Sequence, residues 1–401
     1  MNKEPRLKYS GITSTLVGDL EKLTPFNNAL GIIQNGVDNF YPNRVEAIIN
    51  KSVTSKTCAR LMASYLTGRG DIANNKKIVG GNGYNLLKLI SSISKSITNH
   101  RGVFVLVSYN ANFKPSEYKV LPFKSCRLGK KDDNEFNGKI GYCKDWLRAN
   151  QDDITFFNVF NPSNAEREIQ ESRGNNLAEK VSTYKGQIFY YNLDEEYDYP
   201  LSTIDAVIRD CDSERRASVY KNQSLRKGFF GKQVVITKPL VGDAEDYDEI
   251  EKYYQAQNDR QNFKDTLQDF IGAENNGGVI HFEYDLLDGE NIDNVLKFQK
   301  IDSDIDDKMF EHTESSVFKN ILMAFNSVPP ALVRPENSVF SASGDSINAM
   351  KEVYQNNTQD ERNVVEHIAS YLMMNFYEPL QEVKIEPLIK LNIQRDDAIN
   401  R

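Results

Sequence analysis

The sequence predicts an α+β protein with more than one packed unit, and three observations carry this prediction. The chain has 401 residues, which exceeds the usual size of a single hydrophobic core. In the first half, short apolar runs bounded by Asn, Gly and Pro accompany helical patterns. In the second half, three long helical segments are expected, and a compact insertion separates the first two of them.

The first 25 residues are polar and poorly patterned, which predicts a peripheral arm. Asn43–Leu66 carries apolar residues at helical spacing and predicts a helix or broken helix, ended by Gly68 and Gly70. A second helix is expected over Leu86–Ile97. Four short apolar or aromatic runs then predict strands, at Gly102–Tyr109, Tyr118–Pro122, Ile154–Phe160 and Gln187–Asn192. The polar stretches between them, Gly129–Gly141 and Ser163–Val181, are expected to be surface excursions.

The first long helix is expected over Leu201–Gly228, with Ser202 as its cap. At about 1.5 Å per residue this helix would be roughly 40 Å long. Its apolar residues form only a narrow stripe, which favours packing beside copies of itself. The insertion then follows as a strand, an acidic helix and two strands, at Lys232–Lys238, Asp243–Ala273, Gly278–Tyr284 and Asn294–Ile301.

A second long helix is expected over Ile305–Phe325, ending before the pair Pro329–Pro330. A loop rich in Ser, Asn and Gly follows at Glu336–Gly344. The third long helix is expected over Asp345–Tyr377, closed by Pro379 and followed by a short strand-like tail.

The composition bears on partners and on location. Apolar residues make up 39% of the chain, which favours an oligomer that completes its burial with neighbours. The net charge of −8 indicates that, if DNA is a partner, it is not held tightly through its phosphates. Four distant cysteines (Cys58, Cys126, Cys143, Cys211) are expected to be reduced thiols, and no apolar run approaches a membrane span. The expectation is a soluble protein made in a cytoplasm.

The order of these parts resembles the portal (head–tail connector) family of tailed bacteriophages. Three segments carry the resemblance: Tyr41–Gly70, Asp198–Ile236 and Phe325–Leu372. It implies a mixed α/β wing, two long stem helices, a small α/β clip and a long channel helix. The implied ranges are an arm at 1–25, a wing at 26–200, stem helices at 201–229 and 304–328, a clip at 230–303, a channel loop at 329–344, and a wing helix with a short tail at 345–401. The helical crown of many portals is expected to be absent or vestigial.

The resemblance also implies a function and partners. The chain would be one subunit of a ring, a dodecamer in that family, through which double-stranded DNA is packaged and ejected at a capsid vertex. Its partners would be the terminase large subunit, a head–tail adaptor, and the major capsid or scaffold protein, with no membrane. It would be a virion protein made in the bacterial host cytoplasm. No enzyme activity, catalytic residue, metal or cofactor is expected: no phosphate-binding loop of the ATPase type occurs, and none of the four histidines has a metal-like spacing with Cys or another His.

Three groups of residues are candidates by position. The channel loop would present small polar side chains to DNA, from Glu336, Asn337, Ser338, Val339, Phe340, Ser341, Ala342 and Ser343. The basic residues of the first stem helix are Arg215, Arg216, Arg226 and Lys227. They are expected either to contact phosphates or, as we favour, to pair with the acidic stretch Asp304–Glu314 of a neighbouring subunit. The clip acids are Asp243, Glu245, Asp246, Asp248, Glu249 and Glu251, which either line an electronegative tunnel, meet a partner or form a solvated helix face.

Two other function classes stay open. A metal-dependent phage nuclease would use acidic clusters such as Asp302, Asp304 and Asp306, or the pair of carboxylates within Asp194–Asp198. The first cluster departs from a calcium loop at its sixth and twelfth positions, where Asp307 and Thr313 stand. A tail or baseplate protein that does not bind DNA is the other alternative. The order of long helix, insertion and long helix argues against it.

Overall fold

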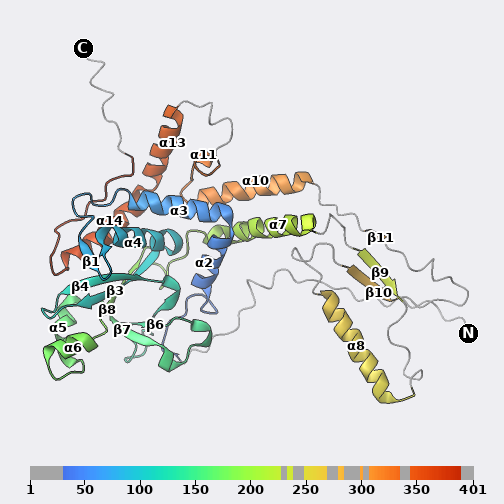
Figure 1. Ribbon diagram of the computed structural model, residues 1–401, viewed down its shortest axis with the longest axis horizontal. Helices are drawn as coiled ribbons and strands as arrows, with labels where there is room; N and C mark the ends of the chain where they lie inside the picture. The colour runs from blue at the N-terminus through green and yellow to red at the C-terminus, as the bar shows by residue number, and fades with distance from the viewer. Residues whose placement is uncertain are drawn as a thin grey trace, which may run out of the picture. The chain divides into compact units, whose positions relative to one another are not determined.

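The structure is a computed structural model that describes residues 30–226, 233–237, 248–268, 279–283, 299–300, 307–334 and 344–389. The chain divides into two units (Figure 1). The larger unit lies within Leu23–Asp212 and Val317–Arg401, and the smaller unit includes Ser213–Ser316. The expected arm at 1–25 lies outside the described residues. The mixed helix and sheet content confirms the α+β prediction.

The larger unit begins with three helices, α2 (Tyr41–Lys51), α3 (Val53–Thr67) and α4 (Leu86–His100). The predicted broken helix is confirmed, and the break falls at Ser52, whose backbone is extended. The Ser52 hydroxyl accepts a hydrogen bond from the amide of Ser55 at 3.0 Å, which satisfies a free donor at the start of α3. The side chain of Asn85 caps α4 in the same way.

A six-stranded sheet forms the centre of the larger unit, in the order β4-β3-β8-β7-β6-β5. All neighbouring pairs are antiparallel except β7 and β8, which are parallel. The strands are β3 (Gly102–Tyr109), β4 (Pro115–Leu121), β5 (Cys126–Leu128), β6 (Lys139–Tyr142), β7 (Thr155–Val159) and β8 (Gln187–Asn192). All four predicted strands are present, with boundaries moved by up to three residues. A separate hairpin pairs β1 (Ile78–Gly80) with β2 (Tyr84–Asn85).

The two predicted surface excursions are only partly correct. Ser163–Val181 contains α5 (Ala165–Glu171) and the start of α6 (Leu177–Thr183). The buried side chain of Ile169 anchors α5, although most of its neighbours are polar. Gly129–Gly141 carries a buried Phe136, and β6 begins within it.

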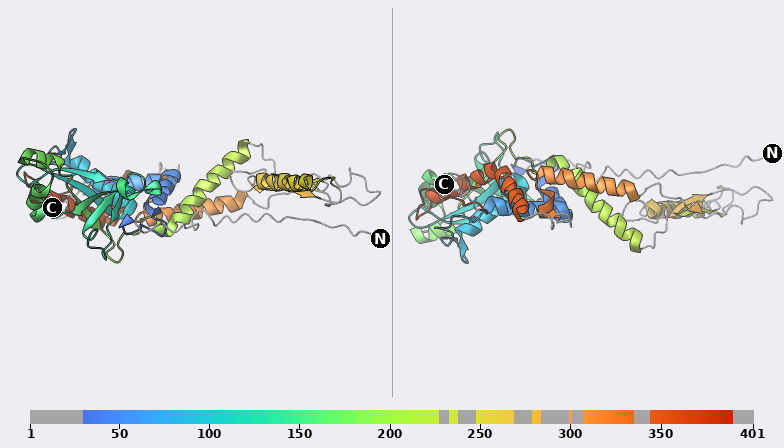
Figure 2. Two further views of the ribbon diagram at one scale, coloured as in Figure 1. Left: turned by 90° about the horizontal axis from the view of Figure 1, so that it is seen from below. Right: turned by 90° about the horizontal axis from the view of Figure 1, so that it is seen from above.

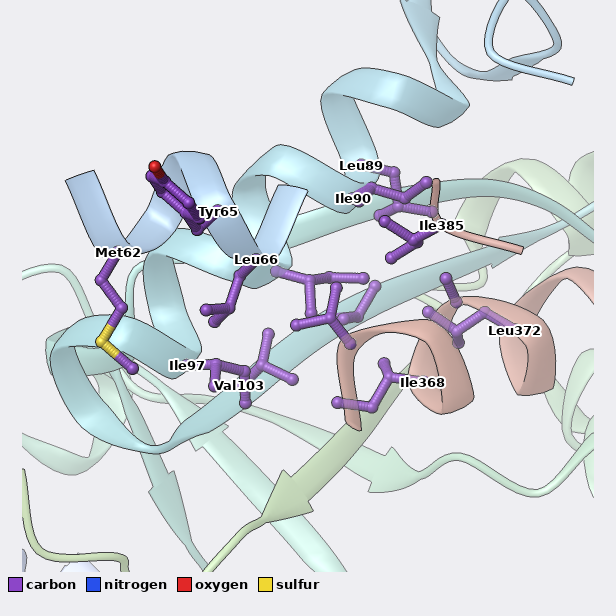
Figure 3. Packing of buried hydrophobic residues seen from close by; sticks show 14 of the residues in the cluster. Met62, Tyr65, Leu66, Leu89, Ile90, Ile97, Val103, Ile368, Leu372 and Ile385 are labelled. Carbon is purple, nitrogen blue, oxygen red and sulfur yellow. The ribbon is translucent and has the colours of Figure 1, made fainter. Parts of the chain in front are cut away.

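Successive side chains of β3 point to opposite faces of the sheet and enter two apolar clusters, so the strand is buried on both faces. Val103, Val105 and Val107 belong to the main cluster, which α4 and α14 (Gln359–Met374) also line (Figures 1 and 2). Figure 3 shows Val103 and Ile97 in this cluster together with Ile368 and Leu372. Phe104 points into the second cluster, which Tyr199 shares. The helices therefore cover one face of the sheet, and the segment that ends at Tyr199 packs on the other.

The predicted helix over Leu201–Gly228 begins later than expected. A 3-10 turn over Asp205–Val207 leads into α7 (Ile208–Arg226). Its 19 residues correspond to about 28 Å at 1.5 Å per residue rather than 40 Å. Ser202 does not cap this helix, because the 3-10 turn stands between them; its hydroxyl donates to the carbonyl of Asn99 at 2.6 Å and accepts from the amide of Ile204 at 3.3 Å. The second long helix is confirmed as α10 (Asp307–Ala324).

The third long helix is two helices, α13 (Gly344–Asn357) and α14, separated at Thr358. The hydroxyl of Thr358 donates to the carbonyl of Tyr354 at 3.0 Å, and the backbone amide of Thr358 donates to the same carbonyl at 3.1 Å. A short helix, α11 (Pro330–Val333), follows α10. The tail after α14 forms no strand among the described residues up to Ile389, so that prediction is wrong. It still buries Val383 and Ile385 in the core.

The smaller unit contains the predicted strand, helix, strand and strand. Strand β9 (Gln233–Thr237) lies between β10 (Val279–Glu283), which is parallel to it, and β11 (Gln299–Lys300), which is antiparallel. Helix α8 (Ile250–Gln268) connects β9 to β10 along the chain. It begins later than the predicted Asp243–Ala273, since Asp248 and Glu249 form a bend before it.

Candidate interface on the two long helices

Three hydrogen bonds fix the segment that leads into α7. The hydroxyl of Tyr41 donates to Asp205 at 2.6 Å and accepts from the amide of Ser202 at 2.9 Å. Thr203 donates to the carbonyl of Thr98 at 2.7 Å, at the end of α4. Burial, followed by the hydrogen bond to Asp205, raises the pKa of Tyr41, so its hydroxyl keeps its proton. The helix therefore starts from a rigid point.

Helices α7 and α10 are antiparallel, as two polar contacts show. In the larger unit the side-chain amide of Asn320 donates to Asp210 at 3.1 Å. In the smaller unit Lys221 forms an ion pair with Glu314. Asp210 precedes Lys221 while Asn320 follows Glu314, so the two helices run in opposite directions. Near the first contact, Cys211 of α7 and Ile321 of α10 are fully buried in the main cluster.

The structure describes only part of the basic group on the first long helix. Arg215 and Arg216 are half-buried on α7, and each has interaction partners. The side chains of Arg226 and Lys227 lie outside the described residues. Glu314, which belongs to the acidic stretch expected to pair with a neighbouring subunit, pairs with Lys221 of the same chain. The pairing expected for Arg215 and Arg216 stays a prediction.

The acidic group of the insertion is exposed where the structure describes it. Asp248, Glu249 and Glu251 are all exposed, and Glu249 contacts Lys252 at 3.5 Å. Asp243, Glu245 and Asp246 lie outside the described residues. On α8 two large apolar side chains are exposed as well, Ile250 by 68% and Tyr254 by 57%. This helix thus presents both carboxylates and apolar surface to solvent.

The expected channel loop, Glu336–Ser343, lies outside the described residues, and hydrogen bonds join the chain segments further before and after it. Asn326 and Asn357 exchange two hydrogen bonds, each from a side-chain amide to a backbone carbonyl, at 3.1 and 3.2 Å. The hydroxyl of Tyr354 donates to the carbonyl of Phe325 at 3.1 Å. These bonds tie the segment after α10 to the end of α13. The guanidinium of Arg334 lies 4.6 Å from the ring centre of Phe318.

The acidic clusters weighed for a metal site are not brought together where they are described. Among those residues, no three His, Cys, Asp or Glu side chains are grouped as a metal ion would require. In Asp194–Asp198, one carboxylate, that of Asp198, contacts Lys131 at 2.6 Å. Asp302, Asp304 and Asp306 lie outside the described part. In that same part, no helix is long and apolar enough to cross a membrane.

The sequence reasoning missed several residues that position the long helices. Tyr41 is far from Asp205 in sequence, and nothing in its local pattern indicates the contact. Glu314 carried a usable signal, because it belongs to the acidic stretch that was expected to pair with basic residues of the first long helix of a neighbouring subunit. Also missed was a group of three cations on α3 and α4, Lys56, Arg60 and Lys95, which line one pocket.

No protein-family model matches the chain, and no curated protein matches it. Among solved structures it is similar to a chain of the virion of a native gene transfer agent (GTA) particle. The identity is 14% and the TM-score 0.49, over 87% of this chain and 84% of that chain. A chain of the neck of the native GTA particle, computed with C12 symmetry, has 15% identity and a TM-score of 0.45, over 90% and 86%. A chain of the neck of the empty GTA particle, computed with C6 symmetry, has 15% identity and a TM-score of 0.43. The match covers 90% of this chain and 87% of that chain. Because these identities and TM-scores are low, no functional role is transferred from these structures, and each role is argued from the residues of this chain.

Proposed function

We propose that the chain is one subunit of a ring-shaped portal, through which double-stranded DNA enters and leaves a phage capsid. One observation carries the proposal: an antiparallel pair of long helices, α7 and α10, is interrupted by a small α/β insertion with a sheet of its own. This is the order of stem, clip and stem that the resemblance implies. In this assignment α7 and α10 are the stem helices, and β9, α8, β10 and β11 form the clip.

The polarity of α7 supports a ring. Of its described side chains only Cys211 is fully buried, while Asp212, Arg215, Arg216 and Val219 are half-buried within one chain. A long helix with so little apolar surface gains burial when copies of it pack side by side. A head-to-tail arrangement that closes on itself gives a ring, and we propose twelve copies, as in the portal family.

The roles of the other parts follow from this assignment. The channel loop, Glu336–Ser343, would line the tunnel and meet DNA with small polar side chains. The clip, with its exposed carboxylates and the exposed Ile250 and Tyr254, would dock the terminase large subunit during packaging and a head–tail adaptor later. The wing would contact the major capsid or scaffold protein. The subunit itself carries no catalytic step, since the terminase supplies the energy from ATP.

The proposed function is tested directly by locating the chain in the assembled particle. Gold-labelled antibody against the chain should mark a single vertex of each assembled particle in electron micrographs. Label on all vertices, or along the tail alone, would contradict the proposal and favour another structural role. Incubating the purified chain with plasmid DNA and Mg²⁺ or Mn²⁺ separates the nuclease alternative, because a portal subunit leaves the plasmid uncut.

A further inference from the structure

A pocket of about 490 Å³ lies among α2, α3 and α4 of the larger unit. Its buried lining includes three apolar side chains, Ile49, Ala59 and Ala63. Its exposed lining includes three cations, Lys56 and Arg60 on α3 and Lys95 on α4. The pocket therefore combines an apolar floor with a positively charged rim.

The three cations have no acidic partner among the described residues. Nearby carboxylates are engaged elsewhere: Glu46 contacts Lys124 at 2.8 Å, and Glu386 lies 3.8 Å from Arg69. Lys56 and Arg60 are four residues apart on one helix, and like charges at this spacing destabilise the helix slightly. In a chain with a net charge of −8, such a concentration of positive charge fits an anionic partner.

The apolar floor decides which anion fits. A DNA phosphate would use the cations and leave the exposed apolar side chain of the lining, Leu388, without a partner. An acidic peptide loop with one large apolar side chain would bury the floor and neutralise the rim at once. The pocket thus fits a short acidic segment with an aromatic or aliphatic residue inside it.

This chain presents such a segment itself, the loop Asp194–Asp198. Glu195 and Glu196 are exposed, and Tyr197 between them and Asp198 exposes 48% of its surface. The carboxylates of Asp194, Glu195 and Glu196 have no side-chain partner among the described residues. The loop is braced, because the side-chain amide of Asn192 donates to the carbonyl of Tyr197 at 2.6 Å. Three unpaired carboxylates beside an exposed ring match three unpaired cations around an apolar floor.

The pocket lies in the helical layer on one face of the sheet, and the loop leads into Tyr199, which packs on the other face. Val103 and Val105 of β3 face the helical layer that contains the pocket. Phe104 faces the other side, in the cluster that includes Tyr199, the residue directly after the loop. A surface and its complement on opposite faces of one chain favour a head-to-tail contact over a twofold dimer.

We infer that the pocket of one copy receives the Asp194–Asp198 loop of the next copy. In this contact Tyr197 covers the apolar floor, and Glu195 and Glu196 meet the cations of the rim. The inference rests on the proposed ring and gives that ring a specific contact between neighbouring subunits.

Charge reversal on each side tests the contact in the full-length chain. The pocket variant carries Lys56→Glu and Arg60→Glu, and the loop variant carries Glu195→Lys and Glu196→Lys. Each alone should raise the concentration for half-assembly at least tenfold, measured by mass photometry. An equimolar mixture should recover assembly, because the reversed loop meets the reversed pocket and the two native surfaces meet each other. A matched control, Lys144→Glu with Arg148→Glu, reverses two exposed cations outside the pocket and should assemble like the wild type.

The possible failures are distinguishable. Wild-type rings together with unchanged assembly of either variant would contradict the contact and leave the proposed function standing. Loss of assembly in the pocket variant but not in the loop variant would also overturn the proposed contact. The pocket would then be assigned to an acidic segment of another protein. If both variants fail and the mixture does not recover, the pairing is wrong. A wild-type chain that forms no oligomer would contradict the proposed function itself.

Discussion

Arg127 is a fully buried cation whose partners are neutral. Its guanidinium donates to the side chain of Asn39, to the carbonyl of Asn39 at 2.6 Å and to the carbonyl of Lys124 at 3.0 Å. The central carbon of the guanidinium, Cζ, lies 5.2 Å from the ring centre of Trp146. Burial lowers the pKa of Arg127 to about 10, so it remains charged at neutral pH. These bonds hold Asn39, which adopts a left-handed backbone with φ of 63°.

Replacing this side chain should destabilise the protein strongly. Arg127→Ala leaves several buried carbonyl groups without donors, and we expect the free energy of unfolding to fall by about 3 kcal/mol. Urea unfolding followed by circular dichroism measures this. Arg148→Ala removes an exposed arginine of the same unit and should change the free energy by less than about 0.5 kcal/mol. Equal effects of the two substitutions would contradict the account of Arg127.

The carboxylate of Glu46 makes the free energy of unfolding depend on pH in the acidic range. Burial raises its pKa, but hydrogen bonds from His100 and Lys124 outweigh burial, and the pKa ends below its usual value. A lowered folded-state pKa gives stability that is present above the unfolded value and is lost as the pH falls through the folded value. Glu46→Gln should therefore cost about 1 kcal/mol at pH 7 and progressively less below about pH 4.5, in unfolding curves measured across pH. A cost independent of pH would contradict this.

At the scale of single residues, the sequence could indicate which groups are unusual but not what they contact. The buried Arg127 looks like any surface arginine in sequence, because its burial is set by Asn39 and Trp146 from distant segments. Lys56 and Arg60 show a like-charged pair at helical spacing, yet Lys95 joins them only through the packing of α3 on α4.

At the scale of elements, apolar contact rather than surface charge is expected to hold α10 in place. Ile321 is fully buried, whereas Met323 on the same helix exposes 68% of its surface. Ile321→Ala should lower the free energy of unfolding by about 2–4 kcal/mol, because it leaves a cavity in the core. Met323→Ala should change it by less than about 0.5 kcal/mol, since surface substitutions rarely do more. Thermal and urea unfolding of the two variants compare them directly, and similar losses would contradict the packing of α10.

Elements with a clear apolar period could be predicted from the sequence, and those shaped by tertiary contacts could not. Helix α4 and strand β3 carry nearly continuous apolar faces and were predicted almost to the residue. The start of α7 was placed too early because a 3-10 turn over Asp205–Val207 precedes it, and no Gly or Pro signals that turn. The break at Thr358 has no Gly or Pro to signal it, and α5 is anchored by too few apolar residues to show a period.

At the scale of the whole molecule, the proposed ring brings together many copies that each carry a net charge of −8. Such copies repel one another unless opposite charges meet at the contact between them. The pocket with Lys56, Arg60 and Lys95 supplies positive charge on one face of the sheet, and the loop with Glu195 and Glu196 supplies negative charge on the other. The order of long helix, small α/β insertion and long helix was predictable from sequence, whereas the grouping of Lys56, Arg60 and Lys95 around one pocket required the fold.

Electron microscopy of the purified full-length chain, with the particle mass measured on the same sample, tests directly whether the chain forms a portal ring. We expect rings with a central hole wide enough for duplex DNA, and a mass equal to many copies of the 45.8 kDa chain. A monomer at every concentration, or a small closed oligomer without a hole, would contradict this expectation.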